Sequence, residues 1–344
     1  MGRHEPYELK QFQALSLSSK IRMTQQRIRQ WVDEFGTDGV YISFSGGKDS
    51  TVLLDIARKD YPNIKAVFID TGLEYPEIRE FVKTFDNVDW IKPKMNFKQV
   101  VEKYGYPFIG KEVSLKVGEA RSKPDGYASR SFDGSRKGTK YDFSKYAFLL
   151  NAPFKVDGVC CKVMKKYPAK KYEKETGRKV ITAQMACESQ AREKEWFQNG
   201  CNAFDKKRPI SNPMSFWTNQ DVLLYIKMNN IPIARVYGDI VIDYEASGQV
   251  EGQMNIFDLS HEFGIFCTGE DEIEILRTTG CNRTGCMFCG FGCHLDRSPG
   301  RFERMKKTHP KQYDYIMRTT DQGGLNFKEV IDWINEHGNL EIKY

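Results

Sequence analysis

The sequence predicts an α/β protein in which a parallel sheet carries helices on both faces. Short apolar runs typical of buried strands alternate with amphipathic segments typical of helices, and this order implies parallel strands joined by right-handed crossovers. A glycine-rich turn follows the first apolar run, and a polar turn follows the second, at the strand ends where open α/β sheets bind ligands. The predicted strands cover 39–44, 65–70 and 88–93, and the predicted helices between them cover 50–61 and 76–85.

Two further helices and a strand complete the pattern. Residues 218–230 predict a helix for which Thr218 is the expected N-cap, with Asp221 at its third position. KVITAQM (179–185) predicts a strand, and FKEVIDWINEHG (327–338) predicts an amphipathic helix that ends at a glycine.

The chain divides into three predicted parts. Residues 1–36 form an N-terminal helical segment, with one helix expected over 8–35. Residues 37–260 form the α/β domain, interrupted over 111–158 by a polar stretch that we interpret as an insertion or lid. Residues 261–344 hold a Cys-rich, metal-binding segment and the C-terminal helices.

Composition excludes several classes of protein. The 344 residues include 40% hydrophobic and 28% charged residues, ordinary for a globular protein, and no apolar run is long enough to span a bilayer. The first residues contain no apolar core of a secretory signal, so we expect a cytoplasmic, reducing location. Nine cysteines there indicate metal or redox chemistry rather than disulfides. The net charge of +6 suits phosphate-bearing ligands without requiring nucleic acid.

The turn after the first strand predicts an anion site. It reads Ser45-Gly46-Gly47-Lys48-Asp49-Ser50 and leads directly into a helix. Glycines let the main chain approach an anion closely, and the unpaired N–H groups and dipole at a helix start favour phosphate or sulfate. The Walker pattern GxxxxGK[ST] and the dinucleotide pattern GxGxxG are both absent.

This turn resembles the SGGxDS signature of the PP-loop superfamily of adenine nucleotide alpha hydrolases. Three more segments resemble the branch that contains the phosphoadenosine phosphosulfate (PAPS) reductases, and they occur in the same order as in that family. They are VFIDTGLEYPE (67–77), ACESQAR (186–192) and NPMSFWTNQDVLLYI (212–226). The resemblance implies that 37–260 is a PP-loop nucleotide-binding domain.

The resemblance also assigns roles to individual residues. Arg192 is expected to complete the site. With Lys48, which adds charge to the loop, it is our candidate catalytic cation. Met185 replaces an arginine that family members often carry, so one expected anion contact is missing. The nucleotide-binding residues are expected to be Ser45, Gly46, Gly47, Asp49 and Ser50 around the phosphate or sulfate, Asp70, Thr71 and Gly72 near the ribose and adenine, and Glu188 and Ser189 completing the site.

The cysteines near the C-terminus have the spacing of metal ligands. Cys281, Cys286, Cys289 and Cys293 fall within thirteen residues, among glycines that allow tight turns. Zinc and iron–sulfur clusters both use such ligands, and the spacing by itself does not choose between them. These four thiols are one complete candidate set.

A tandem pair of cysteines offers a second set. CCKVMKKYP (160–168) resembles the CC-x-x-R-K-x-x-P segment of iron–sulfur sulfonucleotide reductases, with Met164 in place of the arginine and Lys165 retained. The resemblance implies a 4Fe–4S cluster, with zinc as the alternative metal. Its ligands would be Cys160, Cys161, Cys286 and Cys289.

The reaction is less constrained than the binding site. Sulfonucleotide reductases use a cysteine on a C-terminal tail as nucleophile, whereas this chain ends in EHGNLEIKY. Cys293 is our first candidate nucleophile, followed by Cys201, Cys267 and Cys281.

Three functions follow from these features. The first is reduction of PAPS or adenosine phosphosulfate, with a thioredoxin-like protein or glutathione as electron donor. The second is ATP-dependent sulfur transfer to a nucleic acid or small molecule, in which the acceptor is adenylated and the cluster presents the sulfur, with a sulfur donor as partner. The third is a non-catalytic nucleotide- or nucleic-acid-binding module with a structural metal site. In the last two, the basic stretches 121–140 and 162–179 would contact the nucleic acid.

Overall fold

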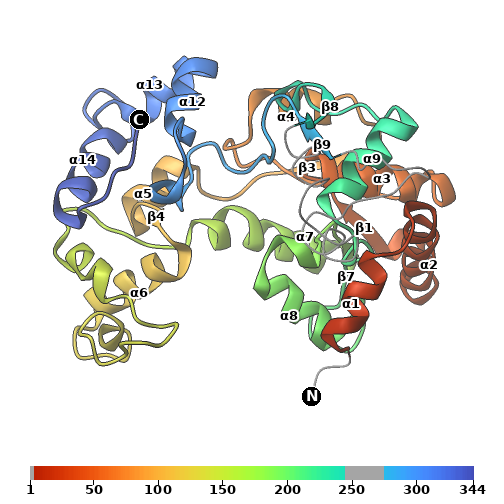
Figure 1. Cartoon of the computed structure of the whole chain (residues 1–344), viewed down its shortest axis with the longest axis horizontal. Coiled ribbons are helices and arrows are strands. Elements are labelled where there is room, and N and C mark those ends of the chain that lie inside the picture. Colours follow the sequence, from red (N-terminus) through yellow and green to blue (C-terminus); the bar gives the residue numbers. More distant parts are fainter. Residues whose placement is uncertain (1–3, 245–274) are drawn as a thin grey trace. The chain divides into compact units, whose positions relative to one another are not determined.

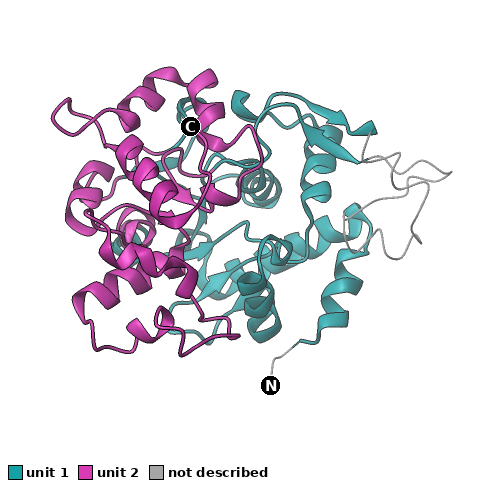
Figure 2. Cartoon of the chain, turned by 60° about the vertical axis from the view of Figure 1, so that its left-hand side comes forward, with its two compact units in different colours: residues 1–70, 74–91, 169–284 teal, residues 71–73, 92–168, 285–344 magenta. Residues whose placement is uncertain are grey.

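A computed structural model describes residues 4–244 and 275–344 (Figure 1). The predicted boundary at 260 and the candidate nucleophile Cys267 lie outside the described residues. The chain forms two compact units that alternate along the sequence (Figure 2). Unit 1 contains residues 1–70, 74–91 and 169–284, and unit 2 contains residues 71–73, 92–168 and 285–344.

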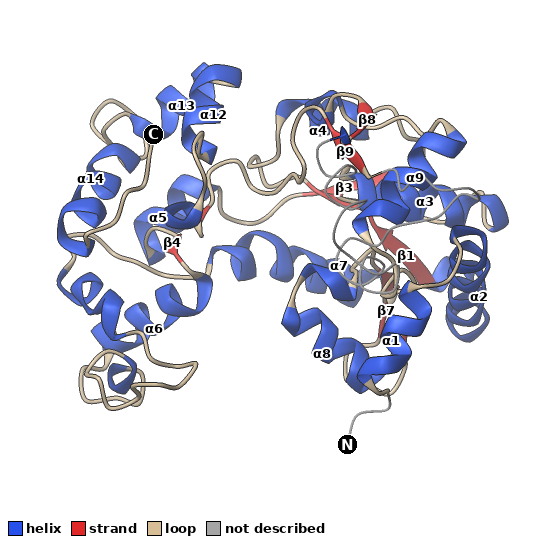
Figure 3. Ribbon diagram, viewed as in Figure 1, coloured by secondary structure: helices blue, strands red, loops and turns tan. Residues whose placement is uncertain are grey.

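Unit 1 is built on a six-stranded sheet with the order β3-β2-β1-β5-β7-β6. Figure 3 shows the strands in red and the helices in blue. All neighbouring strands run parallel except β6 and β7, which are antiparallel. The predicted, mainly parallel sheet is therefore confirmed. Its strands are β1 (Val40–Ser43), β2 (Ala66–Ile69), β3 (Val88–Ile91), β5 (Lys179–Ile181), β6 (Asn202–Ala203) and β7 (Ile210–Ser211).

Successive side chains along the central strands point to opposite faces of the sheet, so unit 1 has one hydrophobic cluster on each face. Val40 and Ile42 of β1 join the main core, whereas Tyr41 points to the opposite face, as the two-residue period of a strand requires. On that face Tyr41 packs against Tyr172 of α7 (Tyr167–Thr176). Helices therefore cover both faces, as predicted.

The main core of unit 1 is formed by helices that pack on the first face. They are α2 (Leu17–Phe35), α3 (Lys48–Asp60), α4 (Pro76–Val82), α8 (Gln190–Asn199) and α9 (Asn219–Asn229). Thr218 caps α9 as predicted, because its hydroxyl accepts a hydrogen bond from the Asp221 amide. An antiparallel pair, β8 (Ile240–Ile242) and β9 (Leu276–Thr278), completes the unit.

The single helix expected over 8–35 is wrong. The structure has two helices, α1 (Pro6–Gln13) and α2, because the Ser16 hydroxyl accepts the Ser19 amide and starts a new helix. The strand expected over 179–185 is also shorter, since β5 ends at Ile181.

Unit 2 is mainly helical and is closed by a short parallel pair of strands. β4 (Phe108–Ile109) pairs with β10 (Gly290–Phe291), which joins two stretches far apart in the sequence. Phe327 packs against Phe108 and Phe302 in the core. The helices are α5 (Phe97–Tyr104), α6 (Lys111–Ser122), α12 (Arg301–Thr308), α13 (Pro310–Met317) and α14 (Phe327–Gly338).

The stretch 111–158 begins with α6 and continues through short 3-10 turns at Ser129–Ser131 and Ser144–Asn151. Arg121 of α6 donates to the Phe154 carbonyl, so this stretch folds back on itself within unit 2. In the described residues, none of the helices has the length and apolar character that crossing a membrane requires.

Candidate functional site

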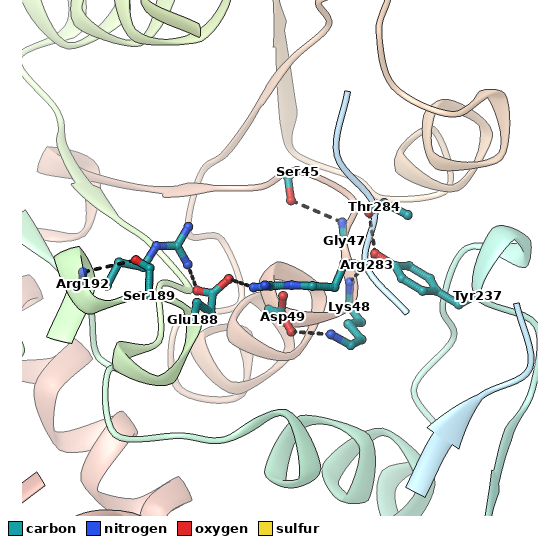
Figure 4. Close-up of a pocket in the computed structure, with 10 residues that line it drawn as sticks. All are labelled: Ser45, Gly47, Lys48, Asp49, Glu188, Ser189, Arg192, Tyr237, Arg283 and Thr284. Atoms are coloured by element: carbon teal, nitrogen blue, oxygen red, sulfur yellow. Dashed lines mark hydrogen bonds and ion pairs between the residues drawn. The ribbon is translucent and has the colours of Figure 1, made fainter. Parts of the chain in front are cut away.

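A cavity of about 380 Å³ lies in unit 1, at the carboxyl end of β1 (Figure 4). The chain leaves β1 with β2 on one side and β5 on the other, and this reversal of strand order opens the crevice in which such sheets bind ligands. Seven predicted residues line it, namely Ser45, Gly47, Lys48, Asp49, Glu188, Ser189 and Arg192, together with Tyr237, Arg283 and Thr284.

The start of α3 points its main-chain amides at this cavity. Gly47 is the N-cap residue and provides no side-chain cap. The Gly47 amide donates to Ser45 Oγ (3.3 Å), and the Lys48 amide donates to the Tyr237 hydroxyl (3.3 Å). Within the described residues, the amides of Asp49 and Ser50 have no hydrogen-bond acceptor. Free amides and the positive end of a helix favour a negatively charged group, and both face this cavity.

The loop needs glycine at position 46 for two reasons. Gly46 has a φ of 71°, a left-handed conformation that other residues rarely adopt. A Cβ at this position would also lie 2.6 Å from Val82 Cγ2 and 2.8 Å from Ile78 Cγ2 of α4. Gly46 therefore lets the loop pack closely on α4 while it turns toward α3.

Charged side chains leave the cavity cationic overall. Lys48 Nζ lies 3.1 Å from Asp49 Oδ1, and the Lys48 side chain is buried. Glu188 forms ion pairs with Arg192 and with Arg283, so three cations face two carboxylates (Figure 4). Burial and the nearby charge of Arg283 lower the pKa of Arg192, which nevertheless stays protonated.

Sequence analysis missed three residues of the cavity. The Tyr237 hydroxyl lies 2.6 Å from Thr284 Oγ1, and burial raises the pKa of Tyr237 to about 12, so it is a neutral phenol. Arg283 and Thr284 lie between Cys281 and Cys286, in the segment CNRTGC. Their polar side chains could have been considered as ligand contacts, but this segment was interpreted only for its cysteines. Nothing local distinguishes Tyr237 from other tyrosines.

Other predicted nucleotide contacts do not line the cavity. Gly46 faces α4, and the Ser50 hydroxyl donates to the Gly47 carbonyl at 2.9 Å. Asp70 follows β2 and is buried in an ion pair with Arg79, at 2.9 Å. Thr71 and Gly72 belong to unit 2. Their contacts with a nucleotide stay predictions.

The four cysteines predicted as ligands line one small cavity of unit 2, of about 20 Å³. The Cys160 thiol lies 4.0 Å from the Cys161 sulfur. This hydrogen bond and burial raise the pKa of Cys160, whereas the same bond and the charges of nearby lysines lower the pKa of Cys161 to about 6. The lining is Leu73, Phe97, Pro107, Cys160, Cys161, Met164, Lys165, Cys286, Phe288 and Cys289.

The side chains that line this cavity include the donor atoms of a thiolate-held metal centre. Four cysteines and a lysine line it, and the lysine would offset the negative charge of a four-thiolate centre. No three Cys, His, Asp or Glu side chains converge on a single ion in the described part of the chain. The volume accommodates one water-sized sphere, so the walls would have to part as a cluster enters.

The candidate nucleophiles occupy different surroundings. Cys293 is buried in unit 2, and burial raises its pKa to about 12. Cys201 and Cys281 belong to unit 1, where burial also raises the pKa of Cys201. The nucleophilic role of Cys293 stays a prediction.

An α/β domain with a glycine loop at the switch point of its sheet has the architecture on which open α/β sheets bind ligands. Residues 39–290 match the phosphoadenosine phosphosulfate reductase domain, and the chain belongs to this family.

Two known proteins resemble parts of the chain. An uncharacterised protein of Methanocaldococcus jannaschii is 44% identical over 70 residues, which are 19% of this chain and 17% of that protein. The chain therefore spans well under two thirds of this curated relative. A crystal structure of PAPS reductase from Candida auris, a phosphate complex, has 19% sequence identity and a TM-score of 0.37, over 67% of this chain and 90% of that one.

Proposed function

We propose that the chain is an enzyme that binds PAPS, adenosine phosphosulfate or ATP with the anionic end in the cavity of unit 1. It would act in sulfonucleotide reduction, using a 4Fe–4S cluster. The observation that carries the proposal is the convergence of three separate segments, 45–49, 188–192 and 283–284, which supply amides and cationic charge to one cavity.

Each segment has a defined task in this proposal. The amides at the start of α3 bind the phosphate or sulfate oxygens, and Ser45 adds a hydroxyl donor. Arg192 and Arg283 stabilise the negative charge that develops on the leaving nucleotide. Glu188 pairs with both arginines and holds them at the cavity.

The proposed cluster ligands are Cys160, Cys161, Cys286 and Cys289. Their shared cavity and soft donor atoms support this set over Cys281 and Cys293, which do not line it. A bound cluster would supply iron centres that exchange electrons or hold sulfur. A thioredoxin-like protein or glutathione would be the electron donor.

A second candidate function is ATP-dependent sulfur transfer. In the described part of the chain, none of the residues lining the unit 1 cavity is a cysteine. Attack on a sulfate sulfur needs a thiolate within reach, whereas ATP cleavage between the α- and β-phosphates needs only the anion site and an acceptor. This observation favours transfer.

Reaction products distinguish the two functions. The wild-type protein is incubated anaerobically with labelled PAPS, adenosine phosphosulfate or ATP. Release of sulfite supports reduction, and release of pyrophosphate supports transfer. Binding without either product would support the non-catalytic module.

The variant Asp49→Ala tests the nucleotide cavity itself. Asp49 fixes the position of Lys48 Nζ at 3.1 Å and is itself an expected nucleotide contact, so its loss should abolish nucleotide-dependent turnover while the fold stays intact. The matched control is Asp60→Ala, at the exposed far end of the same helix. Release of sulfite and of pyrophosphate measures the turnover of both variants, and equal turnover would remove the loop from the proposal.

Metal analysis tests the cysteine cavity. We expect brown protein with about four irons per chain after anaerobic purification. Cys160→Ser and Cys286→Ser should lose iron, whereas Cys187→Ser, at an exposed cysteine of unit 1, should retain it. Colourless protein that contains one zinc per chain would show that zinc, and not a 4Fe–4S cluster, is the metal of this cavity.

A further inference from the structure

A second and larger cavity, of about 570 Å³, lies in unit 2. Its lining combines tyrosine rings, aliphatic side chains and carboxylates, contributed by α5, α6 and the segments after α6 and before Cys160. The residues that matter for its chemistry are Tyr104, Leu115, Glu119, Tyr127, Asp157 and Val159.

The tyrosines of this cavity lie beside cations. The Arg136 guanidinium lies 3.9 Å from the centre of the Tyr127 ring, and Lys103 Nζ lies 5.2 Å from the centre of the Tyr104 ring. Tyr127 is 66% exposed, which is unusual for a large aromatic residue. Aromatic rings and guanidinium planes are the surfaces on which unstacked bases are bound.

Asp157 gives the cavity a hydrogen-bond acceptor. Its Oδ1 accepts the Val159 amide at 2.8 Å, and no Lys, Arg or His of the described chain forms an ion pair with it. A Cβ on Gly118 would lie 2.8 Å from Asp157 Oδ2. A glycine inside a helix costs about 1 kcal/mol relative to alanine. The gap at Gly118 thus leaves room for the Asp157 carboxylate at the cavity wall.

The segment next to the cavity is strongly basic. Residues 121–146, which we name the basic arm, contain seven Lys and Arg against three Asp, a net +4 in a chain whose total is +6. Six of the seven side chains are exposed, and Arg136 is half-buried over Tyr127. The basic residues are Arg121, Lys123, Arg130, Arg136, Lys137, Lys140 and Lys145.

We infer that unit 2 binds a single-stranded nucleic acid, with its phosphates on the basic arm and one unstacked base in the cavity. The base would contact the tyrosine rings and donate an N–H to Asp157. The Asp157 carboxylate would repel an acidic peptide, and the basic arm would repel a small cation. A polynucleotide strand can contact all three kinds of group: its phosphates pair with the cations, and a base stacks on the rings and donates to the carboxylate.

Fluorescence anisotropy with labelled 12-nucleotide strands of RNA and DNA, and with a duplex of the same length, tests this site. We expect both single strands to bind more tightly than the duplex, and binding to weaken steeply with salt. Preference between the RNA and DNA strands identifies which polymer is bound. Equal or tighter duplex binding, or no binding of either strand at low salt, would overturn the inference.

Matched variants separate the basic arm from general charge. Arg136, Lys137 and Lys140 are changed together to Ala. The control changes Lys306 and Lys307 of α12 and Lys311 of α13, exposed lysines of unit 2 outside the basic arm, and removes the same charge. The arm variant should bind at least 10-fold more weakly and the control within twofold of wild type. Equal losses would mean that the chain binds by net charge alone.

Two single variants test the cavity. Tyr127→Ala should weaken binding about 10-fold through lost stacking, and Asp157→Asn should change the order of affinity among single-base homopolymers. Melting temperature checks that both variants are folded. Neither change depends on the nucleotide cavity of unit 1, so nucleotide affinity should stay at the wild-type value in each. Unaltered strand binding by both variants would show that no base enters the cavity.

Discussion

Glu188 illustrates how a single side chain organises the site. Its carboxylate is 9% exposed and pairs with Arg192 one helical turn later and with Arg283, ninety-five positions away. The motif ACESQAR indicated Glu188 and Arg192 only, because their spacing is local. Arg283 joins them through folding and doubles the cationic charge that Glu188 holds at the cavity.

The reactivity of the buried Cys293 thiol can be predicted from its pKa. Because burial raises its pKa from 9.0 to about 12, we expect Cys293 to react slowly with iodoacetamide near neutral pH and faster only as the pH rises toward 12. Cys161, whose pKa is lowered to about 6, is the contrasting thiol in metal-free protein. Mass spectrometry of the labelled peptides measures both rates.

The raised pKa of Cys293 also makes the free energy of unfolding depend on pH. A thiol whose pKa is higher in the folded chain stabilises the fold fully below pH 9.0, and this contribution disappears as the pH rises through about 12. Fast labelling of Cys293 at neutral pH would contradict both expectations and would support its role as nucleophile.

The loop and the helix that follows it form the element on which the proposed nucleotide site is built. The glycines of the loop allow α3 to start at Lys48 with uncapped amides, and α4 packs against the loop from behind. The amides can face a ligand only where the end of the strand and the start of the helix meet. The proposed site therefore needs strand, loop and helix together.

Gly46→Ala tests this element. A left-handed conformation costs alanine about 1 kcal/mol, and the contacts with Val82 and Ile78 add about 1–3 kcal/mol of overpacking. We expect a lower free energy of unfolding and weaker nucleotide binding. Gly36→Ala is the control, because Gly36 has a similar φ of 76° with nothing within 4 Å of its Cβ position. Denaturant unfolding compares them, and equal losses would show that the contacts with α4 contribute nothing.

The whole molecule consists of two units whose chain segments alternate. Unit 2 combines residues 92–168 with 285–344, joined by β4 and β10 and by aromatic packing around Phe327. The two halves of the predicted cluster site, Cys160–Cys161 and Cys286–Cys289, come from these two segments. Folding of unit 2 is thus a condition for bringing the four thiols to one cavity.

Phe327→Ala should unfold unit 2 selectively. The ring is fully buried and contacts Phe97 and Phe108 of one segment and Phe302 of the other, so its loss should cost about 3–5 kcal/mol. We expect limited proteolysis to cleave 92–168 faster, with cleavage in unit 1 unchanged. The control is Phe204→Ala, at a partly exposed ring of unit 1. An unaltered cleavage pattern would mean that the two segments fold independently of Phe327.

Much of unit 1 could be predicted from the sequence. The strands β1 and β2, the loop from Ser45 to Ser50 and the Thr218 cap all depend on residues that are neighbours in the chain, so their patterns are visible without a fold. The break at Ser16 was missed because helical periodicity continues across it, although the serine cap was there to be seen.

The sequence by itself determined the strand–loop–helix element and the family, because periodicity, glycine conformations and ordered motifs are local properties. Only the tertiary structure decided that Tyr237, Arg283 and Thr284 join that site, and that four cysteines from two distant segments line one cavity. The reason is physical: side chains far apart in the chain meet through the packing of apolar cores, and that packing leaves no periodic mark at the polar positions it brings together.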